Sequence, residues 1–176
     1  EVVARQIRSR LLGAPLGDVW VGRADIVREG FETLPWYPGA SLQSVERFGK
    51  SVALGFVKDR VCRYVVAELG MTGLLLFQST PTKHPQHVHV KMLFEDVREP
   101  ELRYWNPRRF GRLSLVDRAG LDRYRTRRFG LDPLAASQQD FVELLQSRRG
   151  RLKSLLMHQQ VIAGIGNIYA NEILFR

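Results

Sequence analysis

The chain has 176 residues, of which 44% are apolar, enough for one large or two small domains with a hydrophobic core, and this excludes a disordered protein. No apolar run is long enough to cross a bilayer, and the first residues lack a signal-peptide pattern, so we expect an intracellular protein without a membrane partner. The 27 Lys and Arg residues against 18 Asp and Glu give a net charge of +9, which indicates a polyanion as partner. The single cysteine, Cys62, excludes an internal disulfide and a Cys-rich zinc site.

The positive charge is concentrated in two stretches. Residues 98–128 contain ten arginines against two glutamates and two aspartates, and Arg148, Arg149, Arg151 and Lys153 follow. Such charges can form a solvated face that only keeps a protein soluble. Arginine heavily outnumbers lysine here and can bind phosphates in a bidentate manner and stack on bases, so we favour a nucleic acid as partner. A membrane surface is disfavoured because no basic amphipathic helix with bulky apolar anchors accompanies the charge.

The first predicted element is an amphipathic helix. Val3, Ile7 and Leu11 are four residues apart with polar residues between them, and Gly13 and Pro15 end this pattern. The segments that follow are short, β-branched or alternating, and separated by turns: DVWVG, SVALGFV, VCRYVVAEL, LLLF, HVHVKMLF and RLSLV. Their spacing predicts an antiparallel sandwich or barrel.

The pattern changes again near FGLDPL. Ser137 followed by Asp140 is typical of a capping box at a helix start, and further helices are predicted around LKSLLMHQQ and from Asn167 onward. We therefore predict an α+β fold in which residues 1–130 form an antiparallel β-sandwich with one flanking helix. Residues 131–176 then begin a helical domain.

The stretch YWNPRRFGRL contains the first candidate functional residues. Pro107 favours a turn, and Phe110 behind Arg108 and Arg109 suits insertion into a base stack. The ring would replace lost stacking, and the arginines would hold phosphates or an orphaned base. Alternatively, Phe110 belongs to the core and the arginines face solvent. Taken alone, this stretch slightly favours the second interpretation.

Two other stretches contain single candidates. Met71 in ELGMTG is either core filling or an apolar wedge at a loop tip. Lys50, at the end of RFGK and just before a strand, is suited to face a phosphate or transfer a proton, although a lone lysine at a strand edge is usually a solvated residue.

A histidine pair and a glycine loop complete the candidates. His84 and His87 lack companions for a metal site, so we expect them to contact phosphate or sugar, and we expect no metal. The stretch GIGN, residues 164–167, precedes an amphipathic segment. Its glycines allow close approach of the backbone to a ligand, and helix-start N–H groups bind anions, to which Asn167 adds a donor. A structural hairpin between two helices would need the same glycines.

In order and spacing, these motifs resemble the formamidopyrimidine-DNA glycosylase and endonuclease VIII superfamily of base-excision repair enzymes. The resemblance covers essentially the whole chain and is carried mainly by NPRRFG at 106–111 and VIAGIGNIYANE at 161–172. It implies a β-sandwich, a helix-two-turn-helix domain and damaged double-stranded DNA in the cleft between them. We expect a monomer in the cytoplasm, associated with the nucleoid in a bacterium.

The resemblance implies a role for each candidate. Lys50 matches a catalytic lysine that donates a proton in β-elimination. Met71, Arg108 and Phe110 match the residues that fill the gap left by the flipped base, with Arg108 reaching the orphaned partner. Asn167 matches the phosphate-binding asparagine of the hairpin. Further DNA contacts are expected from His84, His87, Arg109, Arg148 and Lys153.

The combination of Met71, Arg108 and Phe110 resembles the formamidopyrimidine branch more than the endonuclease VIII branch. It implies a glycosylase with AP lyase activity that removes 8-oxoguanine and formamidopyrimidines from duplex DNA. An endonuclease VIII-type enzyme for oxidised pyrimidines and a non-catalytic DNA-binding module remain alternatives. A general RNA-binding protein would share the charge but should prefer single strands or A-form helices.

The chain also departs from the family pattern. Its first residues resemble the N-terminal helix of the family from a few residues after the beginning of that helix. The Schiff-base proline and its adjacent glutamate are therefore absent, and Glu1 is not that glutamate. The rest of the helical domain, with its zinc finger or zincless equivalent, is absent as well. We interpret the chain as an inactive fragment without a cofactor, zinc being expected, if at all, in the missing finger. Glu68, Asn106 and His158 stand where His, Asp and Asp are common.

Overall fold

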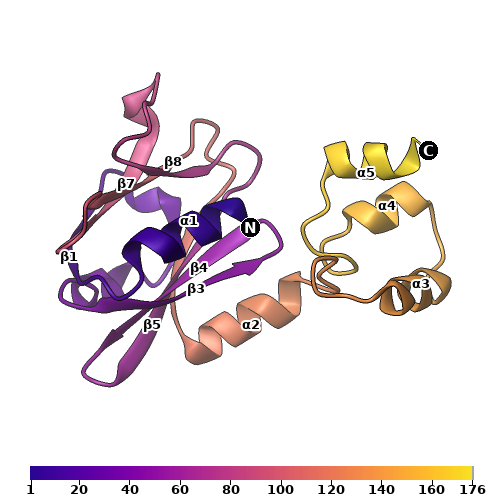
Figure 1. Ribbon diagram of the computed structural model, residues 1–176, viewed down its shortest axis with the longest axis horizontal. Helices are drawn as coiled ribbons and strands as arrows, with labels where there is room; N and C mark the ends of the chain where they lie inside the picture. Colours follow the sequence, from indigo (N-terminus) through magenta and orange to yellow (C-terminus); the bar gives the residue numbers. More distant parts are fainter. Residues whose placement is uncertain (176) are drawn as a thin grey trace. The chain divides into compact units, whose positions relative to one another are not determined.

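The computed structural model describes residues 1–175 and divides, by its internal contacts, into two compact units. Unit 1 comprises residues 1–47 and 51–121, and unit 2 comprises residues 48–50 and 122–176. Figure 1 shows the chain coloured in sequence order. The turn at residues 48–50 connects two strands of unit 1 along the chain, yet its contacts group it with unit 2.

Unit 1 is built from two β-sheets and a helix. Its elements are α1 (Val2–Leu11), β1 (Leu16–Val21), β2 (Val27–Glu29), β3 (Ser41–Phe48), β4 (Ser51–Lys58), β5 (Val61–Glu68), β6 (Leu74–Phe77), β7 (Val88–Phe94), β8 (Glu101–Trp105) and β9 (Leu113–Asp117). One sheet has the order β1-β7-β8-β6 and the other the order β2-β9-β5-β4-β3. Strand β2 pairs with β9 in parallel, whereas β1–β7, β7–β8, β6–β8, β4–β5 and β5–β9 are antiparallel.

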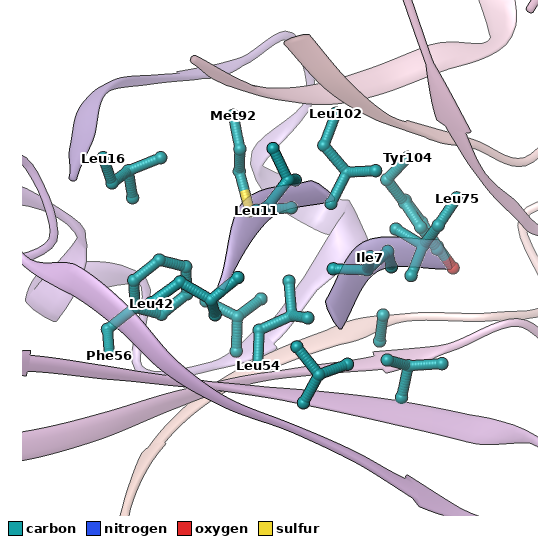
Figure 2. Close-up of a cluster of buried hydrophobic side chains, with 14 of the residues drawn as sticks. Ile7, Leu11, Leu16, Leu42, Leu54, Phe56, Leu75, Met92, Leu102 and Tyr104 are labelled. Atoms are coloured by element: carbon teal, nitrogen blue, oxygen red, sulfur yellow. The ribbon is translucent and has the colours of Figure 1, made fainter. Parts of the chain in front are cut away.

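The core of unit 1 lies between the two sheets, and α1 contributes to it directly. Ile7 and Leu11, one helical turn apart, are fully buried. Figure 2 shows them between side chains of the four-stranded sheet, such as Met92 and Leu102, and side chains of the five-stranded sheet, such as Leu54. Each fully buried aliphatic side chain stabilises the fold by about 1.5–3 kcal/mol. The apolar stripe predicted from the sequence is therefore the stripe that attaches α1 to the sandwich.

The predicted fold class is confirmed, since a β-sandwich with an N-terminal helix precedes a set of helices. The segment HVHVKMLF forms β7, and Val90, Met92 and Phe94 lie in the core as their alternation predicted.

Four elements were not predicted, the short strand β2, the strands β3 and β8, and helix α2 (Arg118–Arg128). Strand β8 buries Leu102 and Tyr104 on one face, with the charged Glu101 and Arg103 between them. Strand β3 buries Leu42 and Val45, which are three residues apart and do not follow the alternation of a strand. Helix α2 carries many charged residues and buries only Leu121 and Tyr124 among its large apolar side chains. It therefore lacks a continuous apolar stripe, which explains why the sequence did not reveal it.

Unit 2 contains the second part of α2, then α3 (Gln138–Gln146), α4 (Leu152–Met157) and α5 (Asn167–Leu174). Helix α3 begins at the predicted capping box: Ser137 Oγ accepts from Asp140 N at 3.1 Å, and Asp140 Oδ2 accepts from Ser137 N at 2.9 Å. The small core of this unit consists of Leu156, Val161, Ile162, Ile165 and Ala170. Within residues 1–175, no helix combines the length and the apolar character that crossing a bilayer requires.

Candidate nucleic-acid interface

The hairpin of residues 158–166 joins α4 to α5 and is held by the segment that precedes α3. Leu131 N donates to Val161 O at 3.0 Å, and Ala163 N donates to Leu131 O at 2.8 Å. These bonds form a short parallel bridge between residues 131 and 162. Gly164 has a φ of +91°, in the left-handed region that favours glycine. Backbone bonds from outside the hairpin thus fix the glycine loop.

The side chain of Gln159 holds the same loop from inside. Its Nε2 donates to Ile165 O at 2.8 Å and to Met157 O at 3.1 Å, while its Oε1 accepts from Gly164 N at 2.8 Å. Two carbonyl oxygens can only accept and one N–H can only donate, so a single orientation of the amide satisfies all three partners. Gln159 therefore connects the end of α4 to the residues just before α5.

Helix α5 presents its N-terminus without a side-chain cap. Gly166 is the N-cap residue, no acidic residue lies in the first turn, and Asn167 at the first helical position is exposed. The first N–H groups of a helix have no acceptor within it, and the helix dipole adds partial positive charge there. This end of α5 is suited to bind a phosphate.

Lys50 lies beside this helix end, within unit 2. A Cβ atom built on Gly166 would be 2.7 Å from Lys50 Nζ, so the ammonium group is directly against the N-cap glycine. Gly49 has a φ of +54°, and a Cβ built on it would be 2.7 Å from Phe129 and 3.3 Å from Gly164 N. The turn of residues 48–50 is thus packed against the glycine loop, and the ammonium of Lys50 adds positive charge to the α5 terminus.

A second group of candidates occupies adjoining loops of unit 1. Met71 and Phe110 are 72% and 58% exposed, and the guanidinium of Arg108 lies over the Phe110 ring, 4.8 Å from its centroid. The two loops pack backbone to backbone, because a Cβ on Gly70 would be 2.7 Å from Gly111 N. Met71 and Phe110 thus extend from neighbouring loops, and neither belongs to the core.

Asn106 is the buried polar centre of these loops. It is fully buried, and its Nδ2 donates to Tyr104 Oη at 2.9 Å, while its Oδ1 accepts from Arg109 N at 3.1 Å and lies 3.4 Å from Thr72 Oγ1. Tyr104 Oη in turn donates to Glu68 O at 2.7 Å. One network therefore links the β5–β6 loop of Met71 to the β8–β9 loop of Phe110.

The network extends to His89 on β7 and to the histidine loop. The Nε2 of His89 lies 3.0 Å from Asn106 O, and Asn106 N donates to His87 O at 2.9 Å. Burial lowers the pKa of His89, and the charges of Arg23, His87 and Arg109 lower it further, against the opposing effect of the Asn106 carbonyl. His89 is therefore neutral at pH 7, with Nε2–H as the donor.

We predict that this buried histidine makes stability pH-dependent. Below the pKa of about 6.5 that an unperturbed histidine has, the unfolded chain binds a proton that the folded chain does not. The free energy of unfolding should therefore fall as pH decreases from 7 to 5, and His89→Gln, which keeps a donor, should reduce this slope. Denaturant titration from pH 5 to 8 measures it, with the exposed His84→Gln as control. Equal slopes for His89→Gln and wild type would contradict the prediction.

The remaining predicted residues lie on the surface. The rings of His84 and His87 are 5.8 Å apart, and His87 lies 6.2 Å from the Trp105 ring. Arg109 adopts a φ of +51° and is 3.8 Å from Asp25, so it already has an acidic partner.

Arg148 and Lys153 are exposed, after α3 and in α4. Lys50 and Asn167 therefore lie in one unit, and Met71, Arg108, Phe110 and the two histidines in the other.

Three residues of the site, Tyr104, His89 and Gln159, were not predicted from the sequence, and Asn106 was identified only as a departure from the family pattern. Their role depends on contacts between loops, which no periodic pattern reveals. Among residues 1–175, no cluster of three or more His, Cys, Asp or Glu side chains is arranged to hold a metal ion.

Two family models match the chain. One describes the formamidopyrimidine-DNA glycosylase N-terminal domain and matches residues 1–113, and the other describes the H2TH domain of the same enzymes and matches residues 129–176. The chain belongs to the formamidopyrimidine-DNA glycosylase family. The family predicted from the sequence motifs is thereby confirmed.

Individual members of the family show the extent of the similarity. The formamidopyrimidine-DNA glycosylase of Acidiphilium cryptum is 34% identical over 182 residues, covering 100% of this chain and 62% of the relative. That of Herpetosiphon aurantiacus is 33% identical, covering 81% of this chain and 56% of the relative. A crystal structure of Lactococcus lactis Fpg (MutM) with FAPY-dG containing DNA matches with a TM-score of 0.79 at 26% identity, covering 98% of this chain and 64% of that one. The chain thus spans about three fifths of these relatives.

Proposed function

We propose that the chain contributes the lesion-engaging and phosphate-binding parts of a bifunctional DNA glycosylase and AP lyase for oxidised purines in duplex DNA. The substrates would be 8-oxoguanine and formamidopyrimidines. The observation that carries the proposal is the exposed pair of Arg108 and Phe110 on a loop anchored by buried hydrogen bonds. Phe110 and the similarly exposed Met71 extend from neighbouring loops, so two apolar side chains lie in solvent close to the cationic Arg108.

In this proposal, the loops of unit 1 engage the gap left by an extruded base. Phe110 would stack in place of the lost neighbour, Met71 would fill the remaining space, and Arg108 would donate to the orphaned base. The stacking of Arg108 on Phe110 in the free chain reduces the ordering cost at binding.

Unit 2 would bind the DNA backbone. The N–H groups at the start of α5, the amide of Asn167 and the ammonium of Lys50 are suited to phosphate oxygens. Lys50 would also donate the proton that β-elimination requires. No residue of this chain is assigned to the amine that attacks C1′ of the damaged nucleotide. The solved Lactococcus lactis relatives, described as complexes with FAPY-dG and with abasic-site DNA, support DNA as the partner.

Borohydride trapping tests this function. The full-length protein should form a covalent adduct with duplex DNA that contains 8-oxoguanine, because borohydride reduces the Schiff base of a lyase. The chain of residues 1–176 alone should form none, because the exposed Lys50 beside Gly166 is proposed to contact a phosphate and donate a proton, not to attack C1′. An adduct with thymine glycol instead would favour the endonuclease VIII alternative. Trapping on no oxidised base would reject the proposal.

A further inference from the structure

Tyr104 and Asn106 lie where three loops of unit 1 meet, and they are the side chains that connect these loops. Asn106 has no exposed surface, and neither does Tyr104. Between them they bind Glu68 O, which ends β5 before the Met71 loop, and Arg109 N, which precedes Phe110. The two loops are far apart in sequence, so their relative position depends on such contacts.

The direction of each bond follows from the chemistry of the groups. Burial raises the pKa of Tyr104 to about 12, so the phenol keeps its proton and donates it to Glu68 O. Its oxygen is then free to accept from Asn106 Nδ2, and Asn106 Oδ1 is free to accept from Arg109 N. The hydrogen bonds from Arg109 through Asn106 and Tyr104 to Glu68 therefore all run in the same donor-to-acceptor direction.

The surrounding backbone leaves these loops little freedom to compensate. A Cβ built on Gly111 would be 2.0 Å from Glu68 O and 2.5 Å from Tyr104 Oη. Glu68 O, Tyr104 Oη and Gly111 thus occupy one closely packed point. A change in the phenol would be transmitted to the backbone on both sides of it, next to Met71 and Phe110.

We propose that Tyr104 and Asn106 are positioning residues that set the distance between Met71 and the Arg108–Phe110 pair for entry into a DNA gap. The inference rests on the proposed function of these loops and adds the residues that place them. Neither side chain is exposed, so both act through the loops and not by touching DNA. Loss of the link should impair recognition of the lesion more than general binding to duplex DNA.

Tyr104→Phe tests the inference, because it removes one hydroxyl and keeps the ring. The matched control is Tyr37→Phe, since Tyr37 is equally buried in unit 1 and its hydroxyl donates to a backbone oxygen, Tyr64 O, at 2.9 Å. Both variants lose a phenol-to-carbonyl hydrogen bond, and Tyr104→Phe also leaves the buried Asn106 Nδ2 without its acceptor, so it should be the less stable of the two. Only Tyr104→Phe removes the side-chain link between Glu68 O, at the end of β5, and Asn106 in the loop of Phe110.

The measurement is the ratio of affinities for two duplexes, one with a tetrahydrofuran abasic-site analogue and one intact, at a temperature where all variants are folded. We expect Tyr104→Phe to lower this ratio about tenfold and Tyr37→Phe to leave it at the wild-type value. Asn106→Leu should lower the ratio at least as far, if it folds. A wild-type ratio of one would reject the proposed function itself. A clear wild-type preference that Tyr104→Phe and Tyr37→Phe both retain, or both lose equally, would overturn the positioning role.

Discussion

The Phe110→Ala variant is expected to fold like the wild type and to lose most of its preference for damaged DNA. Phe110 is 58% exposed, so its removal takes away little buried surface, and the free energy of unfolding should change by no more than about 0.5 kcal/mol. An abasic analogue leaves a gap in the base stack, and loss of the inserted ring removes stacking on the flanking bases worth about 1–3 kcal/mol, so affinity for this duplex should fall about tenfold to a hundredfold. Denaturant titration and DNA binding measure the two effects.

The matched control for this substitution is Phe56→Ala. Phe56 is fully buried on β4 and is packed against Tyr37 and Phe94, so its truncation should cost about 3–5 kcal/mol of stability. If Phe110→Ala destabilised the chain to the same degree, the ring would be a core residue and its proposed role would be wrong. Arg108→Ala should in addition relax discrimination for the base opposite the lesion.

The second large effect is expected for Gln159→Met, which abolishes the three hydrogen bonds of the amide at nearly constant side-chain length. The glycine loop would lose its fixed position in front of α5, and the N–H groups near Asn167 would no longer be preorganised for a phosphate. We expect about a tenfold loss of affinity for duplex DNA. The slope of log K against log salt should become shallower by about 0.9, the value for one phosphate contact.

Gln146→Met, at the exposed end of α3, is the control for this variant. Titrations at several salt concentrations, with all variants folded, separate a lost phosphate contact from a loss of stability. If Gln159→Met kept the wild-type slope, the amide would have no part in the phosphate site. Gln146→Met should match the wild type in both affinity and slope.

The sequence predicts those parts of the fold that follow a period. Helix α1 was predicted because Ile7 and Leu11 recur with the helical repeat, and β7 because Val90 and Met92 alternate. Helix α2 escaped prediction because its arginines leave only isolated buried positions, such as Leu121. A helix or strand can be predicted from the sequence mainly when its buried and exposed faces differ in polarity, and its length matters less.

The candidate site was predictable only in its exposed members. The motifs identified Met71 and Phe110 as candidates, but the sequence does not decide whether these side chains lie in the core or on the surface. Their position depends on how the backbones of Gly70 and Gly111 pack together. Tyr104 follows the inward alternation of β8 and resembles any core aromatic residue until its hydroxyl is seen to bind Glu68 O. Contacts between loops distant in sequence carry this information. The roles of the named residues in DNA binding stay predictions.

The most direct test of the account compares the wild-type chain with Phe110→Ala in their affinities for a duplex with a tetrahydrofuran abasic-site analogue and for the same duplex intact. The exposed ring on its anchored loop should give the wild type a preference of at least about tenfold for the damaged duplex. Phe110→Ala should bind the intact duplex as the wild type does and show little preference. Equal affinity of the wild type for both duplexes, or a preference that Phe110→Ala retains in full, would contradict the account.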